Sequence, residues 1–543
     1  MRFNPCLPAA LCAVALLGLP AALSAEENAA KPAATEKAPD KTLPADSVTQ
    51  GAVQVGGQHI AYTAVAGILT VGATDTQDAQ LGLDGKPLPG SQLALDEPKD
   101  PKDAPPVARI FYVAYFKKDT KAEERPITFL YNGGPGSSTV WLHMGCFGPK
   151  HVMTAGDTHM PAAPYKMIDN AYSLLDVSDL VFIDMPGTGF GRIVGKNAGK
   201  AFWGVDQDAG AFARFVQRFL TKYSRWNSPK YIFGESYGTT RSAVLADILE
   251  NKMNIDLNGV ILLSQIFNFT TDIDMPNGNP GVDLPYVLAL PTYAATAWYH
   301  KKLPQQPPAI EPFLKEVEQF AMGPYSHALA LGTDLSSEEK QQVAEKLHAY
   351  TGLPVSYLLK GDLRINGGEF EKTLQDDQDL TTGRLDTRFS GPTIDPLSEQ
   401  ADYDPQSSAI SSAYVSLFND YVRRDLKYGE GQTYLPEALF GDAQWNMVHH
   451  HNPVGLNVAP DLAEALKTNP RLHVMVNGGY YDLATPFFAA EYEEKHLPIP
   501  QSLAKNIEFD WYESGHMVYV RDESLKNLHD RVAAFIQKTE TAK

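Results

Sequence analysis

A series of short apolar runs, each ending at a glycine-rich or polar turn, limits the fold more than any other feature of the sequence. Helical patterns lie between several of these runs, at 209–223, 240–249 and 525–537. Short, continuous apolar runs are typical of parallel strands that are buried on both faces. We therefore expect an α/β fold with a mostly parallel central sheet flanked by helices. The predicted strands are 127–131, 180–183, 231–233, 260–263 and 474–476.

Two changes in this pattern predict an antiparallel edge and an insertion. Alternating runs at 59–63 and 108–115 predict antiparallel strands at the edge of the sheet. Between about 275 and 450 no buried strand pattern appears, and Ser336 with Glu339 forms a capping box that opens a helix. An insertion after a strand's carboxyl end lies over the active-site edge of such a sheet, so we expect a mostly helical cap or lid. One apolar helical face of it would consist of Phe313, Leu314, Val317, Phe320 and Ala321.

The N-terminal segment has the pattern of a secretory signal peptide. Arg2 precedes an apolar run at 7–23, and small residues follow it up to Ala25. Such a chain is exported, to a periplasmic or extracellular location; a retained N-terminal anchor is the alternative. Few large apolar side chains occur in the next stretch, which predicts a flexible linker. The expected parts are a signal peptide at 1–25, a linker at 26–50, core at 51–274, the cap at 275–450 and the rest of the core at 451–543.

Charge and cysteine content narrow the partners. The chain has a net charge of −19 and no basic cluster, which argues against nucleic acid and anionic membrane surfaces. Cys6 and Cys12 fall within the predicted signal peptide, so Cys146 would be the sole cysteine of the mature chain. An intramolecular disulfide is then excluded, and stability would depend on a large packed core. The sequence leaves a homodimer open.

The segment 233–238, Phe-Gly-Glu-Ser-Tyr-Gly, follows a predicted strand and precedes a predicted helix. In this context G-x-S-x-G forms a nucleophile elbow, in which the glycines permit a sharp turn and the serine lies exposed at the sheet edge. Ser236 is therefore the predicted nucleophile of an α/β-hydrolase fold. A helix N-terminus at this point would also stabilise developing negative charge.

A serine nucleophile requires a base and an orienting acid, which follow in the chain order Ser, Asp, His in this fold. Asp482 comes just after the predicted strand 474–476. His516 follows the predicted strand 507–511. We therefore predict Ser236, Asp482 and His516 as the catalytic triad.

Acyl transfer also requires hydrogen-bond donors for the oxyanion. The segment 131–136, Tyr-Asn-Gly-Gly-Pro-Gly, follows the predicted strand 127–131. We expect the backbone N–H groups of Gly134 and Tyr237 to form the oxyanion hole. The alternative for this loop is a plain tight turn.

Together the motifs resemble the serine carboxypeptidase family, the carboxypeptidase Y and cathepsin A group. The resemblance runs in order from about residue 108 to the C-terminus. It includes Asn132-Gly-Gly-Pro-Gly, Gly148-Pro149, Asn170 with Tyr172-Ser173, Asp184-Met-Pro-Gly-Thr-Gly-Phe190, Gly234-Glu-Ser-Tyr237 and Gly515-His-Met-Val518.

The resemblance implies removal of the C-terminal residue from peptides with a free C-terminus, with the cap shaping the pocket. It also implies that Asn132, the Gly133 N–H and Glu235 bind the terminal carboxylate of the substrate. A buried carboxyl group with a raised pKa can stay protonated and donate a hydrogen bond to that carboxylate. Local packing at the elbow is the alternative role for Glu235.

Two positions depart from the family pattern. Ser137 stands where the family has a cysteine, and Cys146 stands where a second carboxylate-binding glutamate is expected. The structural disulfides of the family are also absent, as in a bacterial-type, cysteine-poor relative. We expect Cys146 and Met517 to line the pocket for the leaving residue, with Cys146 close to Glu235. The loss of the second acid weakens the prediction of carboxypeptidase specificity but not that of hydrolysis.

Neither a cofactor nor a metal ion is predicted. The segment 187–191 lacks the G-x-G-x-x-G spacing of a dinucleotide loop. The histidines at 449–451 have no further ligand at a suitable spacing, which favours a polar loop near the cap boundary. The leading hypothesis is an exported serine carboxypeptidase that acts through an acyl-enzyme on Ser236. A serine esterase, acyltransferase or other peptidase on the same scaffold is the first alternative, and a catalytically silent binding protein is the second.

Overall fold

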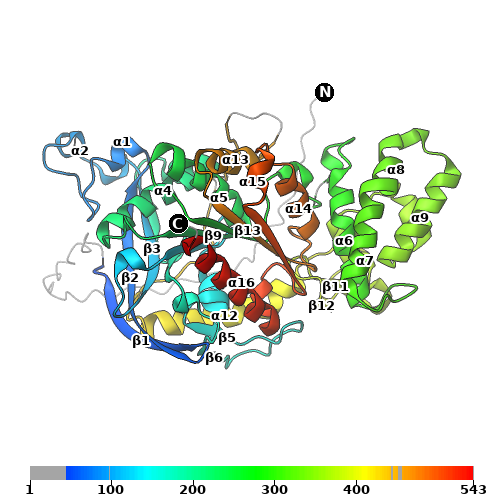
Figure 1. Ribbon diagram of the computed structural model, residues 1–543, viewed down its shortest axis with the longest axis horizontal. Helices are drawn as coiled ribbons and strands as arrows, with labels where there is room; N and C mark the ends of the chain where they lie inside the picture. Colours follow the sequence, from blue (N-terminus) through cyan, green and yellow to red (C-terminus); the bar gives the residue numbers. More distant parts are fainter. Residues whose placement is uncertain (1–43, 97, 275, 442–443, 451–454, 542–543) are drawn as a thin grey trace, which may run out of the picture. The chain divides into compact units, whose positions relative to one another are not determined.

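The computed structural model describes residues 44–96, 98–274, 276–441, 444–450 and 455–541 (Figure 1). The predicted signal peptide and most of the predicted linker lie outside these residues. Strand β1, Ser47–Val55, pairs with β2, Gln58–Gly72, so the last residues of the predicted linker belong to the sheet instead. Their short polar alternation, Ser-Val-Thr-Gln, has too few apolar side chains to be recognised as a strand. No helix in the described part of the chain is long and apolar enough to cross a membrane.

One ten-stranded sheet organises the chain, in the order β1-β2-β3-β7-β4-β9-β10-β13-β14, with β8 paired to β3. The strands β1, β2 and β3 are antiparallel, and β3 also pairs antiparallel with β7. From β7 to β14 all pairs are parallel. Their bounds are β3 Val107–Lys117, β4 Ile127–Tyr131, β7 Asp179–Ile183, β8 Arg192–Val194, β9 Lys230–Glu235, β10 Gly259–Leu263, β13 His473–Gly479 and β14 Ile507–Tyr512. The predicted parallel sheet with an antiparallel edge is confirmed.

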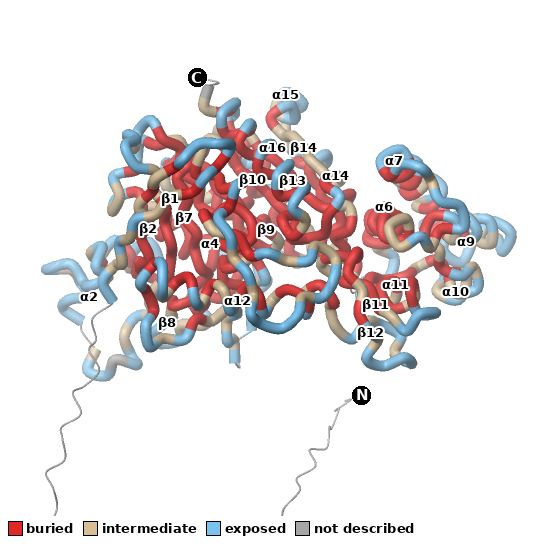
Figure 2. Tube along the Cα trace, turned by 90° about the horizontal axis from the view of Figure 1, so that it is seen from below, coloured by how far each residue is buried: buried red, intermediate tan, exposed pale blue. Residues whose placement is uncertain are grey.

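The two faces of the sheet pack into separate apolar clusters. Along β3, Phe111 and Tyr115 point into one cluster while Tyr112 points into the other, as strand alternation requires. One face is covered by α4 (Val205–Lys222), α5 (Tyr237–Asp247) and α13 (Ala459–Thr468). The other is covered by α12 (Pro405–Arg424), α16 (Asp522–Thr541) and a π-helical turn, Leu142–Phe147. Figure 2 shows the sheet strands buried between these layers.

The insertion between β10 and β13 has two structurally different parts. Its helical part has its own apolar cluster, which contains Phe313, Leu314 and Val317 of the predicted face, and the Ser336–Glu339 capping box is present. This part packs against α14 (Phe487–Lys495), to the right of the sheet in Figure 1. The second part, with the hairpin β11 (Leu380–Thr382) and β12 (Ser390–Pro392), leads into α12 on the core. The helices of the first part are α6 Leu284–Tyr299, α7 Ile310–Phe320, α8 Ser326–Leu331, α9 Ser337–Thr351, α10 Val355–Lys360 and α11 Gly367–Thr373.

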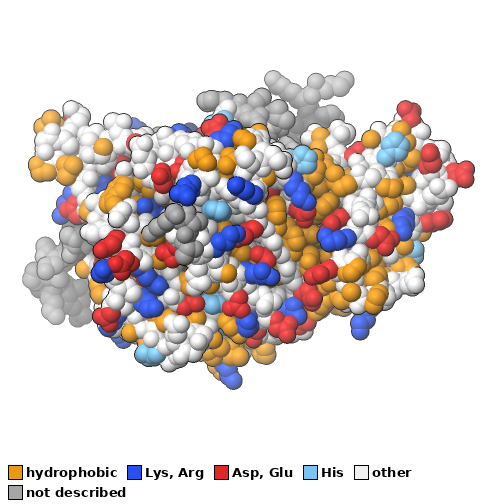
Figure 3. Space-filling view, viewed as in Figure 1, with side chains coloured by type: hydrophobic (Ala, Val, Ile, Leu, Met, Phe, Trp, Pro, Cys, Tyr) orange, Lys and Arg blue, Asp and Glu red, His pale blue; other side chains and the backbone are white. Residues whose placement is uncertain are grey.

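Acidic and basic side chains are interspersed over the face of the molecule drawn in Figure 3. Hydrophobic side chains gather there between α7 and α14. A groove at this place is lined by Leu314, Tyr480, Phe487 and Trp511 among others.

Candidate active site

Ser236 lies at the turn between β9 and α5, with φ +60° and ψ −132°. A non-glycine residue at this φ is unusual and costs conformational energy, as expected of a nucleophile elbow. A side chain on Gly234 would overlap the backbone of Gly238, and one on Gly238 would lie 2.9 Å from the carbonyl oxygen of Tyr131. The Ser236 N–H donates to the Leu263 carbonyl oxygen of β10 at 2.9 Å. Both neighbouring glycines are thus required by close backbone approach.

His516 and Asp482 lie together at the carboxyl edge of the sheet. The Nδ1 of His516 is 2.8 Å from Oδ2 of Asp482, whose side chain is fully buried. Burial opposes the charged imidazolium, but the charge of Asp482 and its hydrogen bond outweigh burial, so the pKa of His516 is raised. An imidazole held in this way keeps its Nε2 for the hydroxyl group of a nucleophile.

Thr485 was not recognised from the sequence. Its Oγ1 donates to Oδ2 of Asp482 at 2.6 Å, and its N–H donates to Oδ1 at 3.0 Å. The same Oγ1 is 3.2 Å from Nδ1 of His516. Thr485 follows Asp482 by three residues, which is the spacing of a local side-chain to backbone turn and the one sequence signal that could have identified it.

The loop that holds His516 is fixed by contacts from distant segments. The Oγ of Ser264, at the end of β10, donates to the His516 carbonyl oxygen at 2.7 Å. The His516 N–H donates to the Leu385 carbonyl oxygen at 2.7 Å, and Gly515 N–H donates to Oδ2 of Asp386 at 3.2 Å. Asp386 is itself buried and paired with Arg388. The second part of the insertion therefore positions the histidine, which no local sequence pattern indicates.

The glycine loop after β4 packs against the start of α5. A side chain on Gly133 would overlap the backbone N–H of Tyr237, so this approach requires glycine. Gly134 has φ +105° and lines the same cavity as Ser236. Tyr237 is the first residue of α5, where helix N–H groups have no partner within the helix. The structure thus packs Gly133, the residue before Gly134, against Tyr237 and brings the glycine loop to the start of α5.

Glu235 is buried beside the nucleophile, with an exposed fraction of 2%. Its Oε2 accepts a hydrogen bond from Nδ2 of Asn132 at 2.8 Å, and the Tyr519 hydroxyl contacts both carboxyl oxygens. Burial raises the pKa of Glu235 to about 7, although these hydrogen bonds act in the opposite direction. A carboxyl group in this environment can be protonated near neutral pH and can then act as a hydrogen-bond donor.

A buried ion pair between Arg241 and Asp208 holds the backbone of Asn132 in place. Nη1 of Arg241 donates to the Asn132 carbonyl oxygen at 2.7 Å, and Nε of Arg241 donates to Oδ2 of Asp208 at 2.6 Å. Both charged side chains are fully buried. Asp208 lies on α4 and Arg241 on α5, so no local sequence pattern indicates that they pair.

One cavity of about 470 Å³ lies beside Ser236, His516 and Glu235. From the core it is lined by the predicted residues Asn132, Gly133, Gly134, Glu235, Ser236, His516 and Met517, and by Ser137 and Trp141. From the insertion it is lined by Arg384, Leu385, Gln406, Ser407, Ile410, Ser411, Val415, Pro436 and Glu437. Among the described residues, none from α6 to α11 lines the cavity. The insertion therefore contributes to the cavity wall through its second part alone, and the core supplies the rest.

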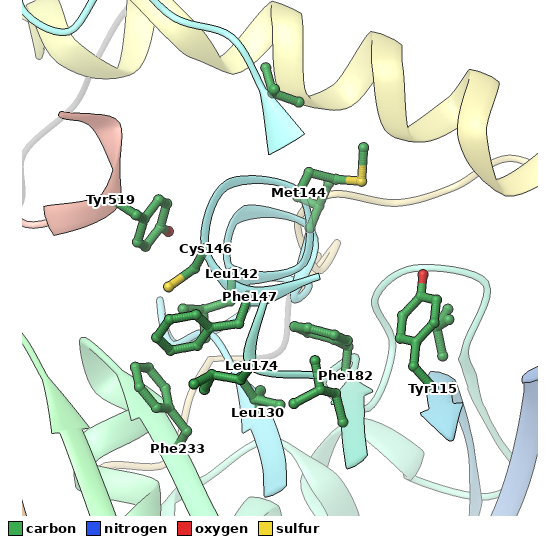
Figure 4. Close-up of a cluster of buried hydrophobic side chains, with 14 of the residues drawn as sticks. Tyr115, Leu130, Leu142, Met144, Cys146, Phe147, Leu174, Phe182, Phe233 and Tyr519 are labelled. Atoms are coloured by element: carbon green, nitrogen blue, oxygen red, sulfur yellow. The ribbon is translucent and has the colours of Figure 1, made fainter. Parts of the chain in front are cut away.

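The prediction that Cys146 lines this cavity is wrong. Its side chain is fully buried, and it is not among the lining residues. Figure 4 shows it in the π-helical turn, with its sulfur among Tyr519, Phe147 and Phe233. Burial raises the pKa of this thiol well above its usual value. The charge of Glu235 raises the same pKa further, as expected from a thiol close to that acid. The thiol does not reach the cavity, however, and the Tyr519 hydroxyl bonds to Glu235 instead.

The fold and these side chains define an α/β-hydrolase with a serine, a histidine and a buried aspartate at the carboxyl edge of its sheet. The chain belongs to the serine carboxypeptidase family, whose family model matches residues 103–506. The predicted family and fold class are confirmed.

Curated relatives share short, divergent segments with the chain. The pheromone-processing carboxypeptidase KEX1 of Cryptococcus gattii is 26% identical over 32% of this chain and 25% of its own length. A serine carboxypeptidase-like protein of Oryza sativa subsp. japonica is 29% identical over 24% of this chain and 28% of its own length. The chain thus matches about a quarter of the length of these relatives.

Solved structures align over most of the chain with low scores. Proline iminopeptidase from Mycobacterium smegmatis is 13% identical, with a TM-score of 0.34, covering 80% of this chain and 96% of that one. A soluble variant of the monoglyceride lipase from Saccharomyces cerevisiae is 11% identical, with a TM-score of 0.31, covering 80% and 92%. The fold follows from the sheet order of the chain itself.

Proposed function

We propose that the chain is an exported serine carboxypeptidase that hydrolyses the C-terminal peptide bond through an acyl-enzyme on Ser236. The observation that carries the proposal is the single cavity lined by Ser236, His516, Asn132 and Glu235. It joins a nucleophile and its base to a carboxyl group suited to a substrate's free C-terminus. The exported location rests on the N-terminal pattern at 1–25 alone.

In the acylation step, Nε2 of His516 takes the proton of the Ser236 hydroxyl while Oγ attacks the scissile carbonyl carbon. Asp482, held by Thr485, keeps the imidazole oriented and stabilises its charge. The N–H groups of Gly134 and Tyr237 donate to the oxyanion. The imidazolium then protonates the leaving amine, and water, activated by His516, releases the acyl group. No cofactor takes part in these steps.

The terminal carboxylate of the substrate would be held by Asn132, the Gly133 N–H and the protonated carboxyl group of Glu235. The pKa of about 7 for Glu235 supports this role below neutral pH, because a protonated acid donates to a carboxylate whereas an ionised one repels it. Met517 would contact the leaving residue from the cavity wall.

The proposal is tested with three reagents on one preparation: a blocked dipeptide with a free C-terminus, an aryl ester and a phosphonylating reagent specific for active-site serines. We expect labelling of Ser236 and cleavage of the dipeptide. Ser236→Ala and His516→Ala should each remove nearly all turnover while the fold is retained, because the triad acts as a unit. Ester cleavage without peptide cleavage would favour an esterase or acyltransferase, and no labelling would favour a binding protein.

A further inference from the structure

A second cluster of polar side chains lies outside the cavity, at the end of the insertion. His449 and His450 converge there on Asp461, in the first turn of α13, and on Asp206, in the first turn of α4. The His449 ring has an exposed fraction of 3% and the Asp461 side chain 1%, whereas His450 is 61% exposed. The sequence indicated only a polar loop here, because Asp206 is remote and Asp461 lies on the next helix.

The nitrogen–oxygen contacts in this cluster are close and share one carboxylate. Nε2 of His449 is 2.9 Å from Oδ2 of Asp461, and Nε2 of His450 is 3.0 Å from Oδ1 of the same residue. The other nitrogen of His449, Nδ1, is 2.6 Å from Oδ1 of Asp206. The His449 and His450 rings lie 3.9 Å apart between centroids.

This arrangement requires positive charge at the His449 ring. A neutral imidazole carries one N–H, which lies either on Nδ1, toward Asp206, or on Nε2, toward Asp461. The other ring nitrogen then directs a lone pair at a carboxylate oxygen, which is repulsive unless a second proton or a metal ion lies between them. A carboxylate that fixes the far nitrogen of a histidine is also the usual support of a metal-binding histidine.

We propose that His449, His450 and Asp461 bind a divalent transition metal ion, zinc being the best match, with Asp206 orienting the ring of His449. Two imidazole nitrogens and one carboxylate are common zinc ligands, and solvent can occupy the fourth position beside the exposed His450. Ligands at about 2.0–2.1 Å from a tetrahedral ion are about 3.3 Å from one another. The contacts of 2.9 and 3.0 Å therefore need to open by a few tenths of an ångström. The ligand atoms lie within 4.8 Å of one another, so the widest separation needs to close around the ion.

The ion would anchor the end of the insertion near the substrate cavity. Just before the histidines, the Asn446 carbonyl oxygen accepts the N–H of Val205 at 3.0 Å. The Trp445 ring packs edge-on against Tyr237, with centroids 5.3 Å apart, and the same segment begins with the cavity residues Pro436 and Glu437. Metal binding would thus hold this cavity wall against the core beside the N-terminus of α5.

The test uses the whole chain, purified without a histidine tag. Metal content is measured by plasma mass spectrometry, and metal-stripped protein is titrated with zinc chloride by calorimetry and thermal unfolding, with magnesium chloride as the control ion. We expect about one zinc per chain and a saturable rise in Tm with zinc only. His450→Ala, at an exposed position, should weaken zinc affinity by about tenfold or more.

His496→Ala is the matched control. His496, just after α14, is also exposed, and its ring has no side-chain hydrogen bond within the described residues other than the one to the Tyr492 carbonyl oxygen. This variant should leave zinc affinity unchanged. Absence of heat and of any Tm change with zinc would overturn the proposal, since a proton on His449 would then supply the charge. Equal zinc affinity in His450→Ala and His496→Ala would also overturn it, by placing the ion elsewhere.

Discussion

The hydroxyl of Tyr519 lies 3.1 and 2.9 Å from the two carboxyl oxygens of Glu235. With Asn132 it surrounds a buried acid whose pKa is raised to about 7. If the protonated acid binds the substrate's carboxylate, kcat/KM for peptides with a free C-terminus should fall as the pH rises above about 7. Glu235→Gln keeps a neutral donor at every pH and should abolish this decline. Initial rates from pH 5 to 9 measure it.

Tyr519→Phe provides the opposite check on the same group. Its hydrogen bond favours the ionised acid, so its loss should raise the pKa of Glu235 further and move the decline to higher pH. An aryl ester without a free carboxylate serves as the control substrate and should not follow either change. If kcat/KM for the free peptide declined at the same pH in Glu235→Gln and Tyr519→Phe as in the wild type, a group other than Glu235 would cause the decline.

Asp482 and Thr485 should differ in the size of their effects. Asp482→Asn should lower kcat by about three to four orders of magnitude through loss of imidazole orientation. Thr485→Val removes the hydroxyl group that donates to Asp482 and should lower kcat by about tenfold with KM nearly unchanged. Steady-state kinetics on the blocked dipeptide measure both.

If Asp482→Asn were fully active, the acid would be another residue. Asp510 and Asp522, two of the aspartates that follow Asp482 in the sequence, are poorly placed for this role. Asp510 pairs with Arg531 at 3.4 Å, and the Asp522 side chain is 87% exposed.

The sequence predicts Ser236, Asp482 and His516 as a triad because each lies in a loop directly after a recognisable strand, where local pattern and fold together determine position. Ser264 and Asp386 were missed because their contacts join segments distant in sequence. Thr485 was missed although its contact with Asp482, three residues away, is local. The direction of the Cys146 side chain depends on the π-helical turn, which shifts the register of side chains relative to an α-helix.

Cys146 is expected to be inert in the folded protein. Because the thiol is fully buried among apolar groups, a bulky thiol reagent should label it only after denaturation, with peptide hydrolysis unaffected before that. Cys146→Glu should lower the free energy of unfolding by about 3 kcal/mol or more, since it buries an unpaired carboxyl group. Cys146→Ala is the milder control. Rapid labelling of the native protein would show that the site is open.

Two neighbouring serines test the role of the insertion as a cavity wall. Ser411 lines the cavity, whereas Ser412, the next residue of α12, is exposed and is not among the lining residues. Ser411→Trp should raise KM for peptides by about tenfold while a small phosphonylating reagent still labels Ser236. Ser412→Trp should leave both properties unchanged. Equal KM values in the two variants would contradict the assigned wall.

The most direct test compares one blocked dipeptide with a free C-terminus and its C-terminal amide, with product release followed by mass spectrometry. Wild-type protein below pH 7 should release the C-terminal amino acid from the free peptide with a kcat/KM at least about a hundredfold above that for the amide. Ser236→Ala should cleave neither peptide. Equal cleavage of both peptides would contradict the assignment of Glu235 and Asn132 to the terminal carboxylate. Activity that survives Ser236→Ala would contradict the assignment of Ser236 as the nucleophile.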